Sequence, residues 1–468
     1  MIDTREIIEA AKVLTLQPKV VEKDYVLGWV LAGINAHPTL TSSFVFKGGT
    51  CLKKCFFETY RFSEDLDFTI TDPGLIDETT LKRAFSEVCR WVYEESGIEM
   101  FADRLRFEVY ENPRGEVSCQ GRLYYRGPVS PRGDPPRIKL DLSADEVLVL
   151  EPTTREVTHP YSDIPESGIQ VQCYAFEEIF GEKIRALGER CRPRDLYDVI
   201  HLFRWEGARN SALPVLEVLK AKCQFKGIGL PTLGALTSHR TELDADWEQM
   251  LAHQLQALPP VEDFWNTLSE FFSWLTGPSV VRPPQAAMSA SGSVVSRREL
   301  GWGSTGYLRG APAMETVYFA AANRLCVDID YKGRVRRVEP YSLRRTNEGN
   351  LLFYGAKADT GEIRCFRVDR IQSAAVTNQS FSPRYAIELT NMGPMSIPAA
   401  RTRRSPAVAP AKSGNLPRGS SGLRYVHECP VCGRRFTRKT RSNALRKHND
   451  KNGYPCSGRR AMLVDTKY

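Results

Sequence analysis

The sequence has no long apolar run, and this absence excludes two classes of protein. A membrane-spanning helix needs about 20 consecutive apolar residues, and the 468 residues contain no stretch of that kind. The first residues, MIDTREIIEAAKVL, include acids and lack the apolar centre of a secretory signal. We therefore expect a cytoplasmic protein with no membrane partner.

The pattern of a disulfide framework is also missing. Nine of the twelve cysteines are scattered singly, whereas Cys429, Cys432 and Cys456 lie near one another in a tail rich in glycine and arginine. Disulfide-stabilised secreted domains instead carry their cysteines densely and at regular spacings. The arrangement favours a reducing compartment and one metal site.

Acidic residues are scarce in the tail. Residues 401–468 contain 17 Lys and Arg against 3 Asp and Glu, or +14, and because the whole chain carries +8, residues 1–400 carry −6. A mildly acidic body with a basic end indicates an appended module for a polyanion such as nucleic acid. The alternative is a solvated tail that aids solubility.

Changes in composition divide the chain into five parts. Residues 278–312 and 396–424 are rich in Pro, Gly, Ser and Ala, which predicts two linkers. They separate an α/β domain at 1–277, a small β-rich domain at 313–395 and a basic, cysteine-bearing module at 425–468.

Apolar periodicity predicts the elements of these parts. Strand patterns cover 44–47, 66–70, 105–110, 117–125 and 137–142, and helical patterns cover 21–34, 175–190, 194–203 and 213–223. Further on, the pairs Lys332-Gly333, Glu348-Gly349 and Thr360-Gly361 separate apolar alternations and predict hairpin turns.

Two carboxylates stand in an apolar strand pattern, "RFSEDLDFTI". Residues two apart in a strand point to the same side, so Asp65 and Asp67 project from one face while Leu66 and Phe68 enter the core. Two like charges this close need a countercharge. Mg²⁺ supplies one and characteristically binds one or two carboxylates together with phosphate oxygens.

A glycine turn precedes these acids. Lys47, Gly48, Gly49 and Thr50 follow a strand and open a helix predicted over 50–57, where backbone N–H groups suit a phosphate. Taken alone, a Gly-Gly pair is an ordinary turn and an Asp-x-Asp an ordinary solvated strand end. Together they predict a site of phosphoryl transfer.

The combination resembles the nucleotidyltransferase pattern, in which a Gly-Gly or Gly-Ser turn is followed by [DE]-x-D. That resemblance implies a mixed sheet of the polymerase-β type with a helical C-terminal part, hence the α/β (α+β) class. It also implies a third carboxylate on a later neighbouring strand. Asp141 in "PRIKLDLS" is our candidate, although an ordinary strand-end acid would look the same.

The resemblance extends over roughly residues 20–205. The segments "VEKDYVLGWVL", "FKGGTCLKKCF", "RFSEDLDF" and "EEIFGEKIRALGERCRPRDLYDVIHLF" together resemble the AbiEii/AbiGii family of nucleotidyltransferase toxins, which includes the MenT proteins. The family implies a toxin of a type IV toxin–antitoxin or phage-defence pair. Such a toxin transfers a nucleotide from an NTP to a cellular acceptor, in some relatives the 3′ end of tRNA.

The resemblance also implies roles for individual residues. Asp65, Asp67 and Asp141 would bind Mg²⁺ or Mn²⁺, and Lys183 would hold a phosphate of the NTP. Asp195 and Asp198 in the Arg-Asp-x-x-Asp segment would orient the acceptor or Lys183. The residues implied at the nucleotide are Lys23, Lys47, Gly48, Gly49, Thr50, Ser63 and Lys183.

Ordinary alternatives remain for two of these residues. Lys183 could be a surface lysine paired with Glu178 or Glu182, and Asp195 could be an acid of a first helical turn, because it follows Pro193.

The β-rich part resembles a WYL domain, a small sensing module for ligands or nucleic acids. The resemblance depends on "VEPYSL", on the strand after Gly349 and on "IRCFRVDRI". The name-giving Trp-Tyr-Leu is absent, with Asn350 to Phe353 in its place. Arg364, Arg367 and Arg370 are candidates for binding a polyanion, and pairing with Asp328, Asp330 or Asp369 is the alternative.

The tail has the residue order of a C2H2 zinc finger, with an apolar residue, Leu445, one helical turn before a histidine. The expected Zn²⁺ ligands are Cys429, Cys432, His448 and Cys456, a Cys3His set that suits a tetrahedral site. The alternative is three incidental cysteines. Basic residues surround the expected ligands and favour contact with a DNA or RNA backbone: Arg434, Arg435, Arg438, Lys439, Arg441, Arg446 and Lys447.

Two functions from different classes follow. The first is a metal-dependent nucleotidyltransferase toxin with an NTP, a nucleic acid (tRNA or DNA) and a cognate antitoxin as partners. The second is a regulator, in which the N-terminal domain binds nucleotide without turnover and the C-terminal modules sense a ligand or nucleic acid.

Overall fold

The computed structural model describes residues 1–57, 59–111, 115, 117–129, 133–277, 286–295, 312–390, 424–438, 445, 447–450, 455–458 and 460–467. The chain forms two compact units, residues 1–400 and 401–468. Within the described residues, no helix is long and apolar enough to cross a membrane.

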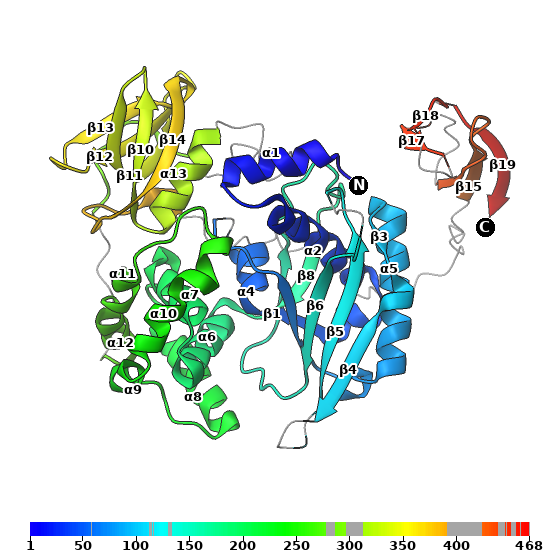
Figure 1. Cartoon of the computed structure of the whole chain (residues 1–468), viewed down its shortest axis with the longest axis horizontal. Helices are drawn as coiled ribbons and strands as arrows, with labels where there is room; N and C mark the ends of the chain where they lie inside the picture. The colour runs from blue at the N-terminus through cyan, green and yellow to red at the C-terminus, as the bar shows by residue number, and fades with distance from the viewer. Residues whose placement is uncertain are drawn as a thin grey trace, which may run out of the picture. The chain divides into compact units, whose positions relative to one another are not determined.

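A mixed eight-stranded sheet is the centre of the first unit (Figure 1). Its order is β3-β5-β6-β2-β1-β8-β7, with β4 also paired to β5. The pairs β1/β8 and β2/β6 are parallel, and the other pairs are antiparallel. The strands are β1 (Phe44–Lys47), β2 (Asp65–Ile70), β3 (Glu99–Met100), β4 (Arg106–Glu111), β5 (Val117–Arg126), β6 (Arg137–Ser143), β7 (Thr153–Glu156) and β8 (Gln170–Cys173). All five predicted strands of this domain are confirmed.

One face of this sheet is the core face. Leu66 and Phe68 of β2 and Leu140 of β6 are fully buried, as the period of two requires. Helix α5 (Glu78–Ser96) covers this face, because its Phe85 ring packs against Phe44 of β1. Helix α2 (Pro18–Ala36), which contains the predicted 21–34 segment, packs beside α5.

Short helices connect the remaining parts of this domain. They are α1 (Thr4–Leu14), α3 (Leu40–Ser43), α4 (Gly48–Cys51) and the single π-helical turn η1 (Leu52–Phe56) that continues α4. The predicted helix at 50–57 is therefore present and begins at the first glycine of the turn.

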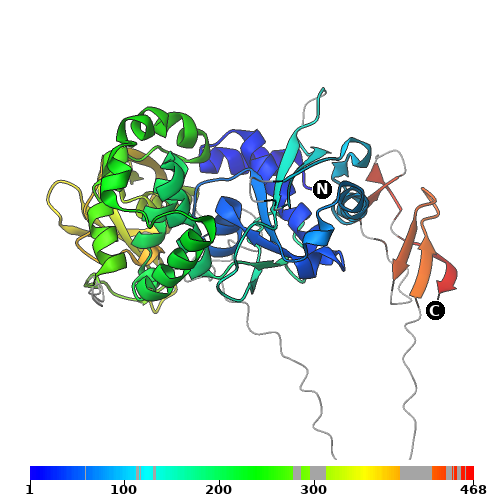
Figure 2. The same cartoon turned by 90° about the horizontal axis from the view of Figure 1, so that it is seen from below.

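A helical part follows the sheet and lies beside it (Figures 1 and 2). Its helices are α6 (Phe176–Arg190), α7 (Pro193–Arg204), α8 (Ala212–Lys226), α9 (Leu233–Thr237), α10 (Arg240–Leu251), α11 (Val261–Trp265) and α12 (Leu268–Thr276). Helix α6 is followed by its C-cap residue Cys191, whose φ of 42° is left-handed. Pro193 starts α7, where its missing N–H is not needed. The predicted helices at 175–190, 194–203 and 213–223 are confirmed.

The β-rich part folds as an antiparallel sheet with one helix. Its strand order is β13-β12-β11-β10-β14, and all three predicted turn pairs connect hairpins, with Gly333, Gly349 and Gly361 at positive φ. The elements are α13 (Pro312–Ala322), β10 (Leu325–Tyr331), β11 (Val335–Arg345), β12 (Leu351–Lys357), β13 (Ile363–Arg367) and β14 (Ile371–Ser380).

Part of the predicted first linker joins this sheet. β9 (Ser293–Val294) pairs with β11, and Met288 is buried in a small core with Tyr341 and Tyr354. A segment too polar to fold alone thus orders on a preformed edge. Residues 278–285, 296–311 and the second linker, 396–424 apart from its last residue, lie outside the described part.

The α/β and β-rich parts share one hydrophobic core. Buried side chains of both, including Tyr197 of α7 and Met314 of α13, belong to a single cluster. The Tyr197 hydroxyl donates to Asn323 Oδ1 at 2.8 Å, with both side chains buried. The two sequence domains therefore pack as one body.

The second unit is small and made of short strands. β15 (Arg424–Glu428) lies between β16 (Arg435–Arg438) and β19 (Met462–Lys467), and β17 (His448–Asn449) pairs with β18 (Pro455–Cys456). His448 stands in a strand opposite Cys456, and most of the segment in which a helical turn is expected before it lies outside the described residues.

Candidate active site and metal cluster

The three acids predicted from sequence lie on one face of neighbouring strands. Asp65 and Asp67 are on β2, and the parallel register of β2 with β6 places Asp141 beside Asp67. This face is opposite to the core face, and all three side chains are only partly buried. The structure therefore brings the three carboxylates to neighbouring positions on the face of the sheet that is opposite to the core face.

The electrostatics of these acids show that they repel one another. Burial, followed by the nearby Asp141 charge, raises the pKa of Asp67 to about 6, although the Lys47 and Lys183 cations act in the opposite direction. Burial and Asp65 also raise the pKa of Asp141. Such a cluster of hard oxygen donors with excess negative charge fits a divalent cation.

The distances between the acids are wider than in a closed metal cage. Among the described residues, two groups have potential ligand atoms that all lie within 4.8 Å of one another, and both contain cysteines. The three acids do not form such a group. The donor chemistry fits Mg²⁺, which commonly takes one or two carboxylates and completes its shell with water and phosphate.

The glycine turn lies directly on these acids. A Cβ atom on Gly48, whose φ is +80°, would stand 2.0 Å from Asp67 Oδ2, and one on Gly49 would stand 2.6 Å from Arg61 Nη2. The Thr50 hydroxyl donates to the backbone oxygen of Asp65. Glycine is therefore required at both positions for the turn to approach Asp67 and Arg61 this closely, and Thr50 holds the turn against β2.

Lys183 belongs to a buried ion network behind the turn. Its Nζ lies 2.8 Å from Asp198 Oδ2, and Arg61 donates to both oxygens of the same carboxylate at 2.7 Å. The Tyr60 hydroxyl also donates to Asp198. Burial opposes ionisation of Asp198, but the Arg61 and Lys183 cations hold its pKa well below the ordinary value.

The two acids of the Arg-Asp-x-x-Asp segment have different partners. Asp198 holds Lys183, whereas Asp195 accepts two hydrogen bonds from Arg190 at 2.7 and 2.8 Å. Asp195 is also in the first turn of α7. The geometry matches the helix-start alternative for Asp195 and gives the orienting position to Asp198. Lys183 contacts Asp198, not Glu178 or Glu182, in the described ion pairs.

The other residues implied at the nucleotide surround the turn. Lys47 is opposite Asp67 in the β1/β2 register and pairs with Glu146 at 3.2 Å. Burial alone would lower the pKa of Lys47, but the Glu146 carboxylate raises it. Ser63 Oγ lies 3.3 Å from the Cβ position of Gly49. Lys23 is less direct, because it pairs with Glu64 at 2.8 Å.

Sequence reasoning missed the role of Arg61. It stands in the quoted "RFSEDLDF" segment, is 3% exposed, and connects the glycine turn to Asp198. A guanidinium buried this deeply requires a carboxylate partner. The available signal was an arginine in an otherwise apolar stretch, but its partner is 137 residues away.

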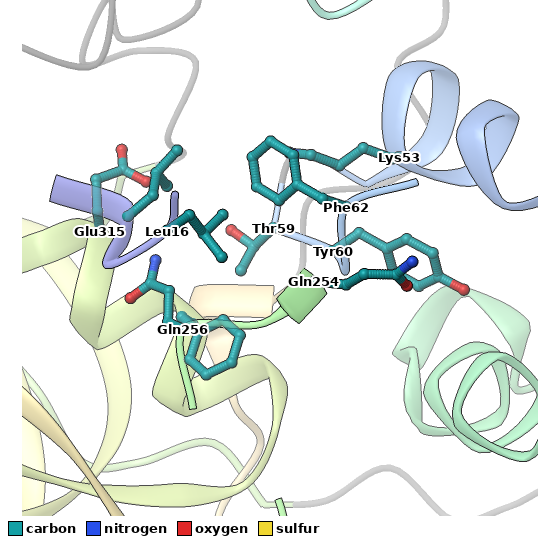
Figure 3. Close-up of a pocket in the computed structure, with 10 residues that line it drawn as sticks. Leu16, Lys53, Thr59, Tyr60, Phe62, Gln254, Gln256 and Glu315 are labelled. Carbon is teal, nitrogen blue, oxygen red and sulfur yellow. The ribbon is translucent and has the colours of Figure 1, made fainter. Parts of the chain in front are cut away.

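A pocket lies next to this network, where the α/β and β-rich parts meet. Tyr60 and Phe62 line it together with Gln254 of the helical part and Glu315 of α13. Figure 3 shows these side chains around the opening, with Leu16 and Lys53 completing the wall. The β-rich part therefore reaches the segment that carries Arg61.

Three of the nine cysteines that are scattered in the sequence lie together in the structure. Cys51, Cys55 and Cys173 are buried, and their sulfur atoms lie within 4.8 Å of one another. Burial raises the pKa of the Cys51 and Cys55 thiols. The sequence hid the cluster because Cys173 is more than a hundred residues downstream of the other two.

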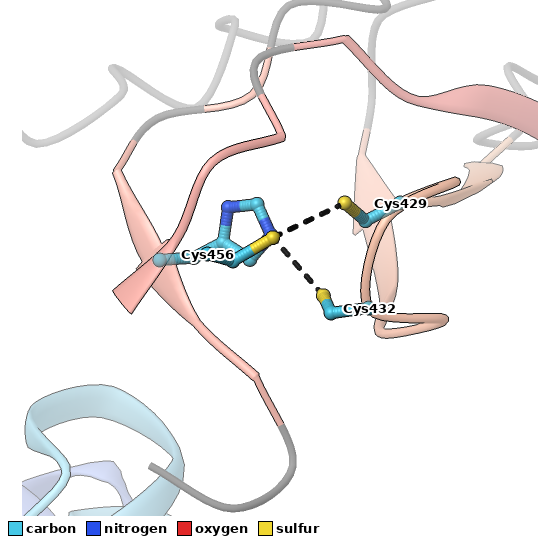
Figure 4. A group of neighbouring side chains, drawn as sticks. Cys429, Cys432 and Cys456 are labelled. Carbon is cyan, nitrogen blue, oxygen red and sulfur yellow. Dashed lines mark hydrogen bonds between the residues drawn. The ribbon is translucent and has the colours of Figure 1, made fainter. Parts of the chain in front are cut away.

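The four predicted tail ligands come together. Possible ligand atoms of Cys429, Cys432, His448 and Cys456 all lie within 4.8 Å of one another. The sulfur atoms of Cys429 and Cys456 are 3.7 Å apart, and Cys432 Sγ is 3.4 Å from His448 Nε2. Figure 4 shows the three labelled cysteines pointing toward one another. This donor set is compatible with Zn²⁺.

The basic residues around this cluster are only partly described. Arg434 and Lys447 are exposed, and Arg435 pairs with Glu428 at 2.7 Å. Lys439, Arg441 and Arg446, and the Arg438 side chain, lie outside the described part. In the β-rich domain, Arg364 pairs with Glu362 and Arg367 pairs with Asp369. For Arg367, the structure therefore matches the alternative in which the arginine pairs with a nearby aspartate.

Two protein-family models match the chain. A family model described as "Nucleotidyl transferase AbiEii toxin, Type IV TA system" matches residues 29–270, more than half of the chain. The chain belongs to the AbiEii family. A WYL-domain model matches residues 312–376, so this AbiEii protein carries a WYL domain after its nucleotidyltransferase domain.

Two solved structures show weak similarity to this AbiEii chain. MenT4, a nucleotidyltransferase toxin from Mycobacterium tuberculosis H37Rv, is similar at 18% identity and a TM-score of 0.37, covering 60% of this chain and 91% of that one. Proteasome accessory factor B/C of Arthrobacter aurescens is similar at 11% identity and a TM-score of 0.15, covering 83% and 36%. No curated protein matches significantly.

Proposed function

We propose that this AbiEii protein is a metal-dependent nucleotidyltransferase toxin of a type IV toxin–antitoxin or phage-defence system. The observation that carries the proposal is the contact of Gly48 with Asp67, together with the strand register that puts Asp141 beside Asp67 on the same face as Asp65. The proximity of these acids, the glycine turn and Lys183 of a distant helix supports a site of phosphoryl transfer.

Each side of the site has a role in the proposal. Asp65, Asp67 and Asp141 would hold Mg²⁺ or Mn²⁺, which would neutralise phosphate charge when bound. Gly48 and Gly49 offer backbone N–H groups to the triphosphate. Lys183, oriented by Asp198, and Lys47 add positive charge on the same side.

The transfer step balances with these groups. The acceptor hydroxyl oxygen forms a bond to the α-phosphorus of the NTP, and the bond to the pyrophosphate oxygen breaks. The hydroxyl proton passes to a carboxylate on the acceptor side. Asp141 suits this role, because it lies on β6, on the side of β2 that is away from β1 and the glycine turn.

The test is transfer of label from α-labelled NTPs in the presence of Mg²⁺ or Mn²⁺ and total cellular RNA, read on both RNA and protein. We expect RNA to take the label, and we expect Asp65→Ala and Asp67→Ala to abolish transfer and growth arrest while remaining folded. Glu217→Ala, on the exposed surface of α8, is the control and should transfer normally. Full transfer activity in both aspartate variants would contradict the proposal.

A second candidate, a regulator that binds nucleotide without turnover, is favoured by the core that the WYL domain shares with the nucleotidyltransferase domain. The same assay separates the two, because only an enzyme transfers label. In a toxin–antitoxin system, co-expression of a cognate antitoxin would restore growth.

A further inference from the structure

Cations lie on both sides of the three acids, on the face of the sheet that is opposite to the core face. Lys47 is on β1, on the side of the glycine turn. On the other side, the register aligns Asp65 with Lys139 of β6, Lys139 with Arg122 of β5, and Arg122 with Arg106 of β4. One row across four strands thus begins at a catalytic-site acid and continues through three basic residues.

All of this row faces away from the core. Lys139 and Arg106 are exposed, and their strand neighbours Leu140 and Phe107 are buried. Because side chains alternate along a strand, the basic residues share the face of Asp65 and Asp141. Adjacent strands are about 4.8 Å apart, so the row extends roughly 14 Å from Asp65 to Arg106.

A second row adds an aromatic ring and a further cation. Tyr124 of β5 is aligned with Arg137 of β6. Arg104, Arg106, Tyr124 and Arg137 line a surface depression together with Asp103 and Asp134. A basic groove with an aromatic side chain is the usual surface for single-stranded nucleic acid, because bases stack on the ring while cations follow the phosphates.

Few of these cations are held in an ion pair in the described part of the chain, although the charge of Lys139 acts on Asp141. Arg122 is bound by Glu108 at 2.7 Å, but among the described residues no ion pair involves Lys139, Arg106 or Arg137. The opposite side of the acids already provides the cations and glycine N–H groups that a triphosphate needs. The basic row is therefore available to a second polyanion.

We propose that the surface formed by Lys139, Arg122, Arg106, Arg137 and Tyr124 binds the acceptor as a single-stranded RNA segment and leads its terminal hydroxyl to Asp141. The inference deepens the proposed function and rests on it for the identity of the site. It favours RNA over a protein acceptor, because a row of cations recognises a regularly charged backbone.

The first test measures binding of a 5′-fluorescein-labelled oligouridylate to the full chain by fluorescence anisotropy. Because the tail is basic, all proteins carry Arg434→Gln, Arg435→Gln and Lys447→Gln. The triple variant Lys139→Gln/Arg106→Gln/Arg137→Gln should bind at least about tenfold more weakly, and the salt slope should fall by about 2, since each phosphate contact contributes about 0.7 for single strands.

The matched control is Arg83→Gln/Arg90→Gln, which removes two exposed cations of α5 on the opposite face of the sheet. It should keep the RNA affinity and the salt slope. Affinity for a non-hydrolysable NTP should stay within about twofold in both variants, because the row does not touch the glycine turn. An unchanged RNA affinity in the triple variant overturns the inference, as does an equal loss of NTP binding.

A second test separates this inference from the proposed function. In the label-transfer assay, the triple variant should raise KM for RNA with little change in KM for NTP. If the triple variant transfers label to RNA with an unchanged KM for RNA, the RNA-binding role of this surface is wrong and the proposed function stands. If label is transferred to a protein acceptor alone, the RNA-binding role is also wrong. If no sample transfers label but the triple variant loses RNA binding, the proposed function fails and the RNA-binding surface stands.

Discussion

Asp67 carries a charge in a place that disfavours it. Its carboxylate lies under the glycine turn and beside Asp141, and burial and that neighbour together raise its pKa to about 6 from an ordinary value of 3.8. Because protonation favours the folded state for such a group, the ionised carboxylate destabilises the fold at pH 7. Stability alone would therefore not select this residue, in keeping with the metal-binding role proposed for it.

This residue yields the first prediction. In metal-free buffer with chelator, Asp67→Asn should be more stable than the parent by about 1–3 kcal/mol at pH 7, although it transfers no nucleotide. The gain should shrink as pH falls from 6 to 4, since the parent carboxylate then becomes protonated. Urea unfolding across this pH range measures it, and a loss of stability at pH 7 would contradict the account.

Asp198 presents the opposite case. Arg61 and Lys183 hold its pKa well below the ordinary value despite burial, so it stabilises the fold above pH 4 and the contribution is lost as pH falls toward the lowered pKa. Asp198→Asn leaves two buried cations without their carboxylate. We expect a loss of about 3–5 kcal/mol at pH 7, measured by denaturant unfolding.

Asp195→Asn is the matched variant for this prediction. Its partner Arg190 is 46% exposed, so water replaces much of the lost interaction, and we expect a smaller loss of about 1–2 kcal/mol. Nucleotide transfer should survive in Asp195→Asn and fail in Asp198→Asn after correction for the folded fraction. Equal effects on both would mean that Asp198 does not specifically orient Lys183.

At the scale of elements, the strand–turn–helix unit β1-α4 is shaped by close contact with β2. Gly48→Ala would place a Cβ against the Asp67 carboxylate at a backbone φ of +80°. We expect a loss of more than about 2 kcal/mol, because both steric overlap and left-handed strain act there. Affinity for NTP should fall as well.

Gly227→Ala isolates the strain alone. Its φ is +68°, and nothing lies within 4 Å of the Cβ position, so the expected loss is about 1 kcal/mol with NTP affinity unchanged. Thermal unfolding and nucleotide titration of both variants check this pair. If the two substitutions lower the free energy of unfolding equally, the contact between the turn and Asp67 does not contribute to stability.

At the scale of the whole molecule, the nucleotidyltransferase and WYL parts are coupled through Tyr197 and Asn323. Tyr197 precedes Asp198, so the hydrogen bond joins the WYL domain to the helix that orients Lys183. A double-mutant cycle of Tyr197→Phe and Asn323→Ala should give a coupling free energy of about 0.5–1.5 kcal/mol. Strictly additive losses would show that the contact does not join the two parts.

The tail should behave separately because it forms its own unit. We expect purified protein to carry one Zn²⁺ per chain in the tail, lost in Cys456→Ser, and the small strands of that unit to unfold on chelation. Elemental analysis measures the metal. Cys326→Ser, at a buried cysteine of the β-rich domain outside both cysteine clusters, is the control and should keep the metal.

The amino-acid sequence by itself predicted the strands that carry the acids, the helices that carry Lys183 and Asp198, the glycine turn and the grouping of Cys429, Cys432, His448 and Cys456, because periodicity and motif spacing are local signals. It did not determine which acid of the Arg-Asp-x-x-Asp segment holds Lys183, since a helix turn separates Asp195 from Asp198 and only packing against Arg61 distinguishes them. The tertiary structure also decided the cluster of Cys51, Cys55 and Cys173 and the basic row beside Asp65. These groups come from separate segments, and strand register and side-chain packing, not sequence neighbourhood, bring their charges and sulfur atoms together.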